Sequence, residues 1–396
     1  MERNLKVLVI TTAFPRSEND VITPWLVKEI KLLSERGFEV KVFTSSYGGI
    51  KQKEFQGIKI YRFRYAPKKI EKLTHDAAVP TLIKVKPVYI LLVLPYLLSG
   101  FFHSIILSLK ENFDIIYVQW PIPHIIFALP HKIIRGSKIV TYFHGSDAAL
   151  LRRLPKLLKL LFSGLCSLSS VTFTNSSYIR NLLLNLGIKT KFEIIPLGNP
   201  HLDSMLPYKE KRRINILFVG RLIDLKGVDV LIKAFEAVQK KYRDTYLTIV
   251  GDGPLKEDLL HLVQELNLDN VTFTGFLTGE PLRTAFEEAS ILVLPSIVNK
   301  QGETEGLGMV LVEALSFGIP VIGSEVGGIP DIIIEGKTGL LARPGDPDDL
   351  ANKIIKLIEN PELRKTLVEG GQKHIKENFS WESIIDRIEK YFRKIV

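Results

Sequence analysis

Cysteine is almost absent from this chain of 396 residues, because Cys166 is the only one. An internal disulfide is therefore excluded, and the composition favours a reducing compartment. The first apolar run, Val7–Ile10, is too short for a secretory leader and is better interpreted as a buried strand. We therefore expect a cytoplasmic protein.

Acidic residues are scarce in the first half of the chain. Residues 1–200 hold 28 Lys and Arg against 13 Asp and Glu, whereas residues 201–396 hold 25 against 30. This asymmetry indicates that the first half meets an anionic partner. We expect no nucleic acid, because the basic residues form neither a recognition motif nor a platform interleaved with aromatic side chains. An anionic membrane surface is then the remaining candidate for the anionic partner, and we expect peripheral contact with it.

Two further patterns are missing. The dinucleotide fingerprint Gly-x-Gly-x-x-Gly does not occur, since Gly251-Asp252-Gly253-Pro254 lacks the third glycine, and a hydride-transfer enzyme loses support. The eight histidines are scattered, and no Asp-x-Asp follows a predicted strand. We therefore expect no metal site.

Short apolar strands do alternate with helical patterns along the chain. Such spacing predicts an α/β fold built from parallel, doubly wound sheets, and the length favours two domains with a boundary near 198–213. In sheets of this kind, ligands bind beyond the C-terminal ends of the strands. The predicted strands are Val7–Ile10, Glu39–Phe43, Lys59–Phe63, Ile115–Val118, Lys138–Tyr142, Val171–Thr174, Glu193–Ile195, Ile214–Val219, Thr245–Val250, Val271–Thr274, Ile291–Leu294 and Pro320–Gly323.

Two glutamates eight positions apart, Glu305 and Glu313, enclose the most informative segment. The residues Gly306, Leu307 and Gly308 lie just before a predicted helix, where backbone N–H groups suit an anion such as a phosphate. An anion site flanked by carboxylates suggests a ligand that is part phosphate and part polyol, as in a nucleotide sugar. A surface glutamate and a helix glutamate around a tight turn would give the same spacing.

Other loops after predicted strands carry polar residues. Arg221 and Lys226 lie in a strand-to-helix turn where both can reach a diphosphate, although ordinary solvated charges look the same. His144 lies at a strand end, where it can donate a hydrogen bond or take part in proton transfer, and Asp147 either accompanies it or caps a helix. Gly251 and Gly253 either approach a ligand or form a tight turn.

Taken together, these loops resemble those of the family 4 glycosyltransferases, which have the two-domain GT-B fold. The motifs occur in order over nearly the whole chain. They are His-Gly-x-Asp at 144–147, Gly-Arg-Leu…Lys-Gly at 220–227, Gly-Asp-Gly-Pro at 251–254, Glu305…Glu313, Val-Gly-Gly-Ile-Pro-Asp at 326–331 and Gly-Leu-Leu…Pro-Gly-Asp-Pro at 339–347.

The resemblance implies two Rossmann-like domains facing a central cleft. It assigns residues 1–200 to the acceptor, residues 201–379 to a nucleotide-sugar donor, and residues 380–396 to a helix that packs back on the first domain. It places Arg221 and Lys226 at the donor diphosphate, Glu305 near the donor sugar, Glu313 at the ribose hydroxyls and His144 at the reaction centre.

Two loops depart from the family pattern. Thr11–Pro15 lacks the Gly-Gly pair that is common after the first strand, so no phosphate contact is carried over to it. Tyr117-Val118-Gln119-Trp120 replaces a common His-x-His-Trp, so no acceptor chemistry is carried over there.

The sequence thus predicts a retaining, metal-independent glycosyltransferase that takes its sugar from a UDP or GDP donor and needs no cofactor. We expect a glycan or lipid-linked acceptor. A nucleotide-sugar 2-epimerase shares the predicted architecture and remains an alternative, as does a non-catalytic sugar- or lipid-binding relative.

Two apolar segments bear on the membrane. Ala149–Leu165 has leucines at intervals of three and four residues with Arg and Lys on much of the other side, as in a helix on anionic lipid, although Pro155 interrupts it. Val88–Phe102 is strongly apolar, and its length predicts that it is too short to span a bilayer. Both segments could instead be core helices of the first domain.

Overall fold

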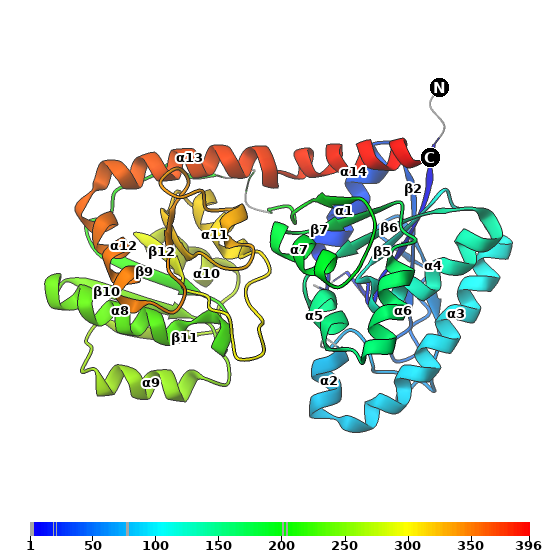
Figure 1. Cartoon of the computed structure of the whole chain (residues 1–396), viewed down its shortest axis with the longest axis horizontal. Helices are drawn as coiled ribbons and strands as arrows, with labels where there is room; N and C mark the ends of the chain where they lie inside the picture. Colours follow the sequence, from blue (N-terminus) through cyan, green and yellow to red (C-terminus); the bar gives the residue numbers. More distant parts are fainter. Residues whose placement is uncertain (1–3, 19, 21, 77–78, 200–201, 203–204) are drawn as a thin grey trace. The chain divides into compact units, whose positions relative to one another are not determined.

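A computed structural model describes residues 4–396 except 19, 21, 77–78, 200–201 and 203–204. The chain divides into two compact units, shown in Figure 1. Unit 1 runs to Asn175 and adds Ile179–Ile195 and Ile384–Val396, and unit 2 contains Ser176–Tyr178 and Pro196–Ser383. The division along the chain falls between Ile195 and Pro196, and the end of the chain belongs to unit 1.

Unit 1 is built on an eight-stranded sheet in the order β3-β4-β2-β1-β5-β6-β7-β8. All its pairings are parallel except β3 with β4. The strands are β1 (Lys6–Ile10), β2 (Glu39–Ser45), β3 (Glu54–Phe55), β4 (Ile58–Phe63), β5 (Ile115–Gln119), β6 (Lys138–Phe143), β7 (Val171–Thr174) and β8 (Phe192–Ile194). The helices are α1 (Pro24–Glu35), α2 (Val79–Val85), η1 (Pro87–Leu92), α3 (Val93–Lys110), α4 (Pro121–Arg135), α5 (Ser146–Arg153), α6 (Lys156–Cys166) and α7 (Ser177–Asn185).

Unit 2 is built on a six-stranded, wholly parallel sheet in the order β11-β10-β9-β12-β13-β14. The strands are β9 (Ile214–Val219), β10 (Thr245–Val250), β11 (Val271–Gly275), β12 (Ile291–Leu294), β13 (Val321–Ser324) and β14 (Leu340–Ala342). The helices are η3 (Asp224–Lys226), α8 (Val228–Lys241), α9 (Lys256–Glu265), α10 (Gly279–Glu288), α11 (Met309–Ser316), η4 (Ile329–Asp331), α12 (Pro347–Glu359) and α13 (Pro361–Phe379).

The apolar strands form the centre of each unit. Every residue of β12 is buried, as are four of the five residues of β1, because helices cover both faces of such parallel sheets. The predicted α/β class and doubly wound parallel sheets are therefore confirmed. β9 and β12 lie side by side at the middle of the unit 2 sheet, so the loops that follow them meet at one sheet edge.

The last helix, α14 (Trp381–Ile395), packs on unit 1 over the residues from Ile384 onward. The Arg36 guanidinium pairs with Asp386 at 2.7 Å, and the ring of Phe392 lies 5.2 Å from that of Tyr117. The Tyr391 hydroxyl donates to Glu193 at 2.7 Å. Residues distant in sequence thus complete the core of unit 1.

The structure corrects the expectation about the apolar segment near residue 90. Val88–Phe102 is part of a longer helical stretch, Pro87–Lys110, made of η1 and α3. By length and composition alone, this is one helix among the described residues that could cross a membrane. Pro95 does not end it, because a proline in the first turn of an α-helix removes no intrahelical hydrogen bond.

A histidine in the core of unit 1 makes stability depend on pH. His131 in α4 is wholly buried beside Phe113, and neither ring nitrogen has a hydrogen-bond partner among the described residues. Burial lowers the pKa of His131 to about 4. A lowered histidine pKa means that the unfolded chain takes up a proton first, so stability falls as the pH drops below about 6.5.

We therefore expect His131→Leu to stabilise the protein more at pH 5 than at pH 8. The difference should be about 2 kcal/mol in the free energy of unfolding, since only the wild type loses stability through protonation of residue 131 in the unfolded chain, while the other buried histidines affect both proteins alike. Denaturant unfolding of unit 1 at the two pH values measures it. His261→Leu, on the exposed side of α9, is the control. Equal gains at both pH values would contradict the prediction.

Candidate active site

Lys226 and Glu305 form the centre of the candidate site in unit 2. Lys226 ends η3 in the loop after β9, and Glu305 lies in the loop after β12. The Lys226 ammonium makes a short ion pair with Glu305 Oε2, and the two side chains are only 15% and 14% exposed. Ser296 Oγ donates to the same carboxylate oxygen at 3.4 Å. The structure therefore brings together two predicted site residues that are 79 positions apart.

Gly227 explains how Lys226 reaches this position. Its φ of +62° ends η3 and begins α8, a conformation that favours glycine. A Cβ at Gly227 would lie 2.1 Å from the carbonyl oxygen of Pro295. The loops after β9 and β12 thus touch through backbone, and this contact sets the lysine against the glutamate.

Arg221 lies in the same loop but is not part of the ion pair. Its side chain is exposed, and no described residue makes a hydrogen bond or ion pair with its guanidinium. The structure therefore leaves Arg221 available to a ligand at the C-terminal end of β9.

The two glycines after Glu305 differ in what the fold requires. Gly308 has φ +93° at the N-cap of α11, and a Cβ there would lie 2.9 Å from the side chain of Leu294. At Gly306, by contrast, a Cβ would meet nothing within 4 Å, and φ is not positive. Leu307 between them is buried in the unit 2 core. The fold explains Gly308 and Leu307, but it leaves the absence of a side chain at Gly306 unexplained.

Glu313 lies on α11, one turn after its start. Burial raises its pKa to about 7, so neutral and ionised forms are close in free energy near neutral pH. It borders a recess of about 320 Å³ between α10 and α11, which is also lined by Arg283, Phe286 and Phe317. A carboxyl of this kind can accept hydrogen bonds from hydroxyl groups, and such bonds would favour its ionised form.

The other glycines of the predicted site pack loops against one another. A Cβ at Gly251 would lie 1.8 Å from the carbonyl oxygen of Gly220, and one at Gly253 would lie 2.4 Å from that of Leu222. In the same way, a Cβ at Gly327 would lie 2.0 Å from the carbonyl oxygen of Glu305. From the sequence, Gly251 and Gly253 were expected either to approach a ligand or to form a tight turn. These backbone contacts give a structural reason for the tight turn.

His144, which the family resemblance places at the reaction centre, lies in unit 1, and aromatic rings surround it. The rings of Tyr142, Trp120 and Trp25 lie 4.2, 4.7 and 4.9 Å from its own. This enclosure lowers the pKa of His144 to about 3, so the imidazole is neutral at physiological pH. A neutral ring of such low basicity suits hydrogen bonding better than proton abstraction.

Gln119 orients the His144 ring, and sequence reasoning missed it. His144 Nε2 lies 2.7 Å from Gln119 Oε1. With the amide oxygen as acceptor, Nε2 carries the proton, and Nδ1, which has no partner among the described residues, presents a lone pair. The available signal was register, because β5 and β6 are neighbours and Gln119 pairs with Tyr142.

Asp147 holds the His144 loop together. Its Oδ1 accepts from the backbone N–H groups of His144, Gly145 and Ala148 at 3.1, 2.9 and 3.0 Å. The carboxyl is 3% exposed, and burial raises its pKa to about 7. These contacts fix the loop before α5. The helix N-cap role expected from the sequence is wrong, because Asp147 lies within the first turn of α5 and the N-cap is Gly145.

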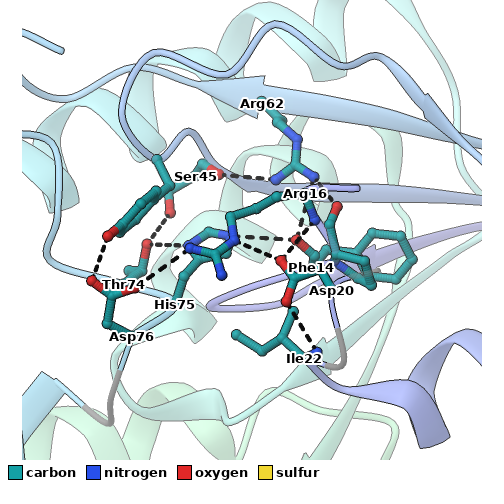
Figure 2. A network of polar contacts seen from close by, with 11 residues as sticks. Phe14, Arg16, Asp20, Ile22, Ser45, Arg62, Thr74, His75 and Asp76 are labelled. Atoms are coloured by element: carbon teal, nitrogen blue, oxygen red, sulfur yellow. Dashed lines mark hydrogen bonds and ion pairs between the residues drawn. The ribbon is translucent and has the colours of Figure 1, made fainter. Parts of the chain in front are cut away.

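The loop after β1 is fixed by side chains instead of glycines, as Figure 2 shows. Arg62 donates to the carbonyl oxygens of Pro15, Phe14 and Ser45 at 2.6, 3.3 and 3.4 Å. Burial lowers the pKa of Arg62 to about 10, which leaves it charged. This arginine therefore ties the ends of β1 and β2 together beside β4.

A second arginine completes the network of Figure 2. Arg16 Nε pairs with Asp20 at 2.6 Å, and its Nη1 lies 3.4 Å from Asp76. His75 Nε2 contacts the Phe14 carbonyl oxygen at 3.3 Å, and burial next to the arginines lowers its pKa to about 4. Thr11–Pro15, which lacks the Gly-Gly pair common in the family, thus belongs to a loop whose charged side chains pair with one another.

Comparison with known proteins gives the family. The model for glycosyl transferases group 1 matches residues 207–374, and that for glycosyltransferase family 4 matches residues 26–199. An uncharacterized glycosyltransferase of Methanocaldococcus jannaschii, MJ1178, is 32% identical over 72% of this chain and 77% of its own. The N-acetyl-alpha-D-glucosaminyl L-malate synthase of Bacillus anthracis is 30% identical over 72% and 76%.

A solved structure agrees in fold. Anabaena Alr3699/HepE in complex with UDP superposes with a TM-score of 0.72 at 19% identity, over 98% of this chain and all of that one. The chain therefore belongs to the group 1, family 4 glycosyltransferases, and its two parallel-sheet units have the GT-B fold.

Proposed function

We propose that this glycosyltransferase moves a sugar from a nucleoside-diphosphate sugar to an acceptor hydroxyl with retention of configuration. The observation that carries the proposal is the Lys226–Glu305 ion pair beside the open position at Gly306. An ammonium group has three N–H donors, so Lys226 can keep Glu305 and still bind a diphosphate oxygen. A UDP or GDP donor fits this chemistry, and UDP is bound in the HepE structure.

The proposed roles follow from where each charge lies. As the bond between the anomeric carbon and the diphosphate oxygen breaks, Lys226, Arg221 and the backbone N–H groups of Gly306–Gly308 stabilise the departing oxygen. Glu305 holds the sugar end of the donor, and Glu313 accepts from the ribose hydroxyls. Cations of the protein are thus proposed to do what a metal ion does elsewhere.

Retention is proposed to occur by attack on the face that the diphosphate leaves. The acceptor oxygen bonds to the anomeric carbon while its proton passes to the departing phosphate oxygen, so no protein nucleophile is needed. His144 stays neutral and serves as a hydrogen-bond partner of the sugar. Trapping a covalent sugar–enzyme intermediate would overturn this mechanism.

The acceptor is proposed to be lipid-linked or otherwise held at the membrane, with the enzyme on the cytoplasmic side. The strong excess of Lys and Arg in residues 1–200 supports this, since the inner leaflet carries anionic lipid. A soluble glycan as the preferred acceptor, with no gain from its presentation on vesicles, would contradict this part of the proposal.

Gly306 offers a test of donor binding that is separate from folding. We expect UDP- or GDP-sugars to raise the melting temperature of the wild type, because a ligand bound only by the folded state stabilises it by about 2.7 kcal/mol at a hundred times its Kd. Gly306→Ala should melt normally without ligand, since a Cβ there meets no protein atom, yet lose most of the donor shift.

The thermal-shift assay, combined with assays of donor conversion, distinguishes the alternatives. UDP-, GDP- and ADP-sugars are compared, and a full donor shift in Gly306→Ala would show that the ligand does not approach this backbone. Conversion of the donor without any acceptor would identify an epimerase instead. A donor shift without hydrolysis or transfer would identify a non-catalytic binding protein.

A further inference from the structure

In helix α3 of unit 1, the distribution of apolar and polar side chains is the reverse of that in a surface helix of a water-soluble domain. The exposed side of α3 carries a row of large apolar side chains, and its buried side is mostly small or polar. The exposed row consists of Leu94, Leu98, Phe102, Ile106 and Leu109, with Leu91 of η1 just before them, each 47–71% exposed. The buried side consists of Tyr96, Gly100, Ser104, Leu107 and Ser108. Single exposed leucines are ordinary, but a continuous row on one side of a helix marks a surface that water does not normally cover.

The buried side fastens α3 to α4 along its length. Tyr96 Oη lies 2.9 Å from His124 Nε2, and Ser104 Oγ donates to the Phe127 carbonyl oxygen at 2.5 Å. Near the end of the helix, Arg135 Nε donates to the Ser108 carbonyl oxygen at 2.7 Å. α3 is thus an integral helix of unit 1, and its apolar row faces away from α4. We infer that it lies on a bilayer and does not cross it.

Helix α6 repeats the inversion. Leu157, Leu160 and Leu161 are more than half exposed, whereas Ser163 and Cys166 are buried. α4 contacts both α3 and α6, and it adds Ile133, which is 79% exposed. Figure 1 shows these three helices together in unit 1. The apolar row of α3, Ile133 and the exposed leucines of α6 are called the apolar face below.

Charge indicates what covers the apolar face. Residues 77–192 contain 13 Lys and Arg but only three acidic residues, of which Asp147 is buried. Lys86, Lys110 and Lys156 are exposed at the ends of the helices that form the face, and no described residue pairs with them in an ion pair. A second copy of the chain would bring like charges together, whereas an anionic bilayer offers hydrocarbon for the leucines and headgroup charge for the lysines.

We propose that the apolar face docks unit 1 onto anionic lipid, with α3 and α6 in the headgroup–acyl boundary. The face is close in sequence to the candidate site, because α5, about 12 Å long, joins the His144 loop to α6. Docking there would hold the acceptor-binding unit at a surface where lipid-linked acceptors are found. This deepens the proposed lipid-linked acceptor and rests on that part of the proposed function, although lipid binding itself needs no turnover.

Vesicle flotation of the full-length protein tests the proposal. The wild type is expected to float with phosphatidylcholine vesicles containing phosphatidylglycerol, and to float much less with phosphatidylcholine alone. Leu94→Ser, Leu98→Ser and Phe102→Ser combined should lower partitioning at least tenfold, and Lys156→Glu with Lys159→Glu should do so at low salt. The matched controls, Leu184→Ser on α7 and Lys365→Glu on α13, change exposed residues outside the face and should float like the wild type.

Each outcome decides the question. Circular dichroism and donor-induced thermal shifts of every variant show whether the fold and the donor site are intact, independently of lipid. Failure of the wild type to float, or equal flotation of the triple variant, overturns docking even if the donor shift is normal. A dimer in solution that the triple variant dissociates, without vesicle binding, would make the face a contact between copies and would overturn the proposal as well.

Discussion

Replacing Lys226 with alanine is expected to lower kcat/KM for the true donor at least tenfold, and most of the loss should appear in kcat. One well-placed donor to a developing anion contributes roughly 3 kcal/mol, and Lys226 is the cation at the centre of the candidate site, with a side chain that is only 15% exposed. The loss should be greatest for the step in which the diphosphate departs. With an activated donor, whose leaving group needs less stabilisation, the Lys226→Ala variant should recover part of the lost rate. Steady-state kinetics with both donors measures this.

The substitution also leaves Glu305 without its cation, and this effect must be separated from catalysis. An unpaired carboxylate with little exposure destabilises its surroundings. Lys226→Ala combined with Glu305→Gln removes the charge, so the double variant should regain stability but not turnover. Lys233→Ala breaks an exposed Lys–Asp pair on α8 and is the matched control. Unchanged turnover of Lys226→Ala would rule out the diphosphate role.

Most strands and the positions of the loops after them were predictable from the sequence, because alternating apolar runs and glycines mark them directly, although β3 and β14 were not predicted. Contacts between loops were not. Lys226 meets Glu305 because β9 and β12 are neighbours in the sheet, an arrangement that neither local segment reveals. Gln119 meets His144 for the same reason, through the neighbouring strands β5 and β6.

The apolar face shows a second limit of sequence reasoning. From the sequence, Ala149–Leu165 was expected to be a helix on anionic lipid and Val88–Phe102 to be too short to span a bilayer, with core helices of the first domain as the alternative for both. Which side of a helix is buried depends on its neighbours. Gly100 decides it for α3, because a Cβ there would lie 2.5 Å from the ring of Phe127, so only a glycine lets α4 approach on that side.

Gly251→Ala is expected to destabilise unit 2 by at least about 3 kcal/mol. Its φ of +141° is unfavourable for a side chain, and its Cβ would lie 1.8 Å from the carbonyl oxygen of Gly220. Backbone strain accounts for about 1–3 kcal/mol of such a change, and the overlap with a backbone atom adds to it. The loops after β9 and β10 would have to separate, which would also displace Arg221.

Two other glycines of unit 2 separate these contributions. Gly275 has φ +74° but an open Cβ position, so Gly275→Ala should show strain alone, about 1 kcal/mol. Gly306 has neither a positive φ nor a close contact, so Gly306→Ala should unfold like the wild type. Scanning calorimetry of the unit 2 transition without ligand ranks the three. If Gly251→Ala were no less stable than Gly275→Ala, the loops after β9 and β10 would not be held by backbone contact, and donor binding would then have to explain this glycine.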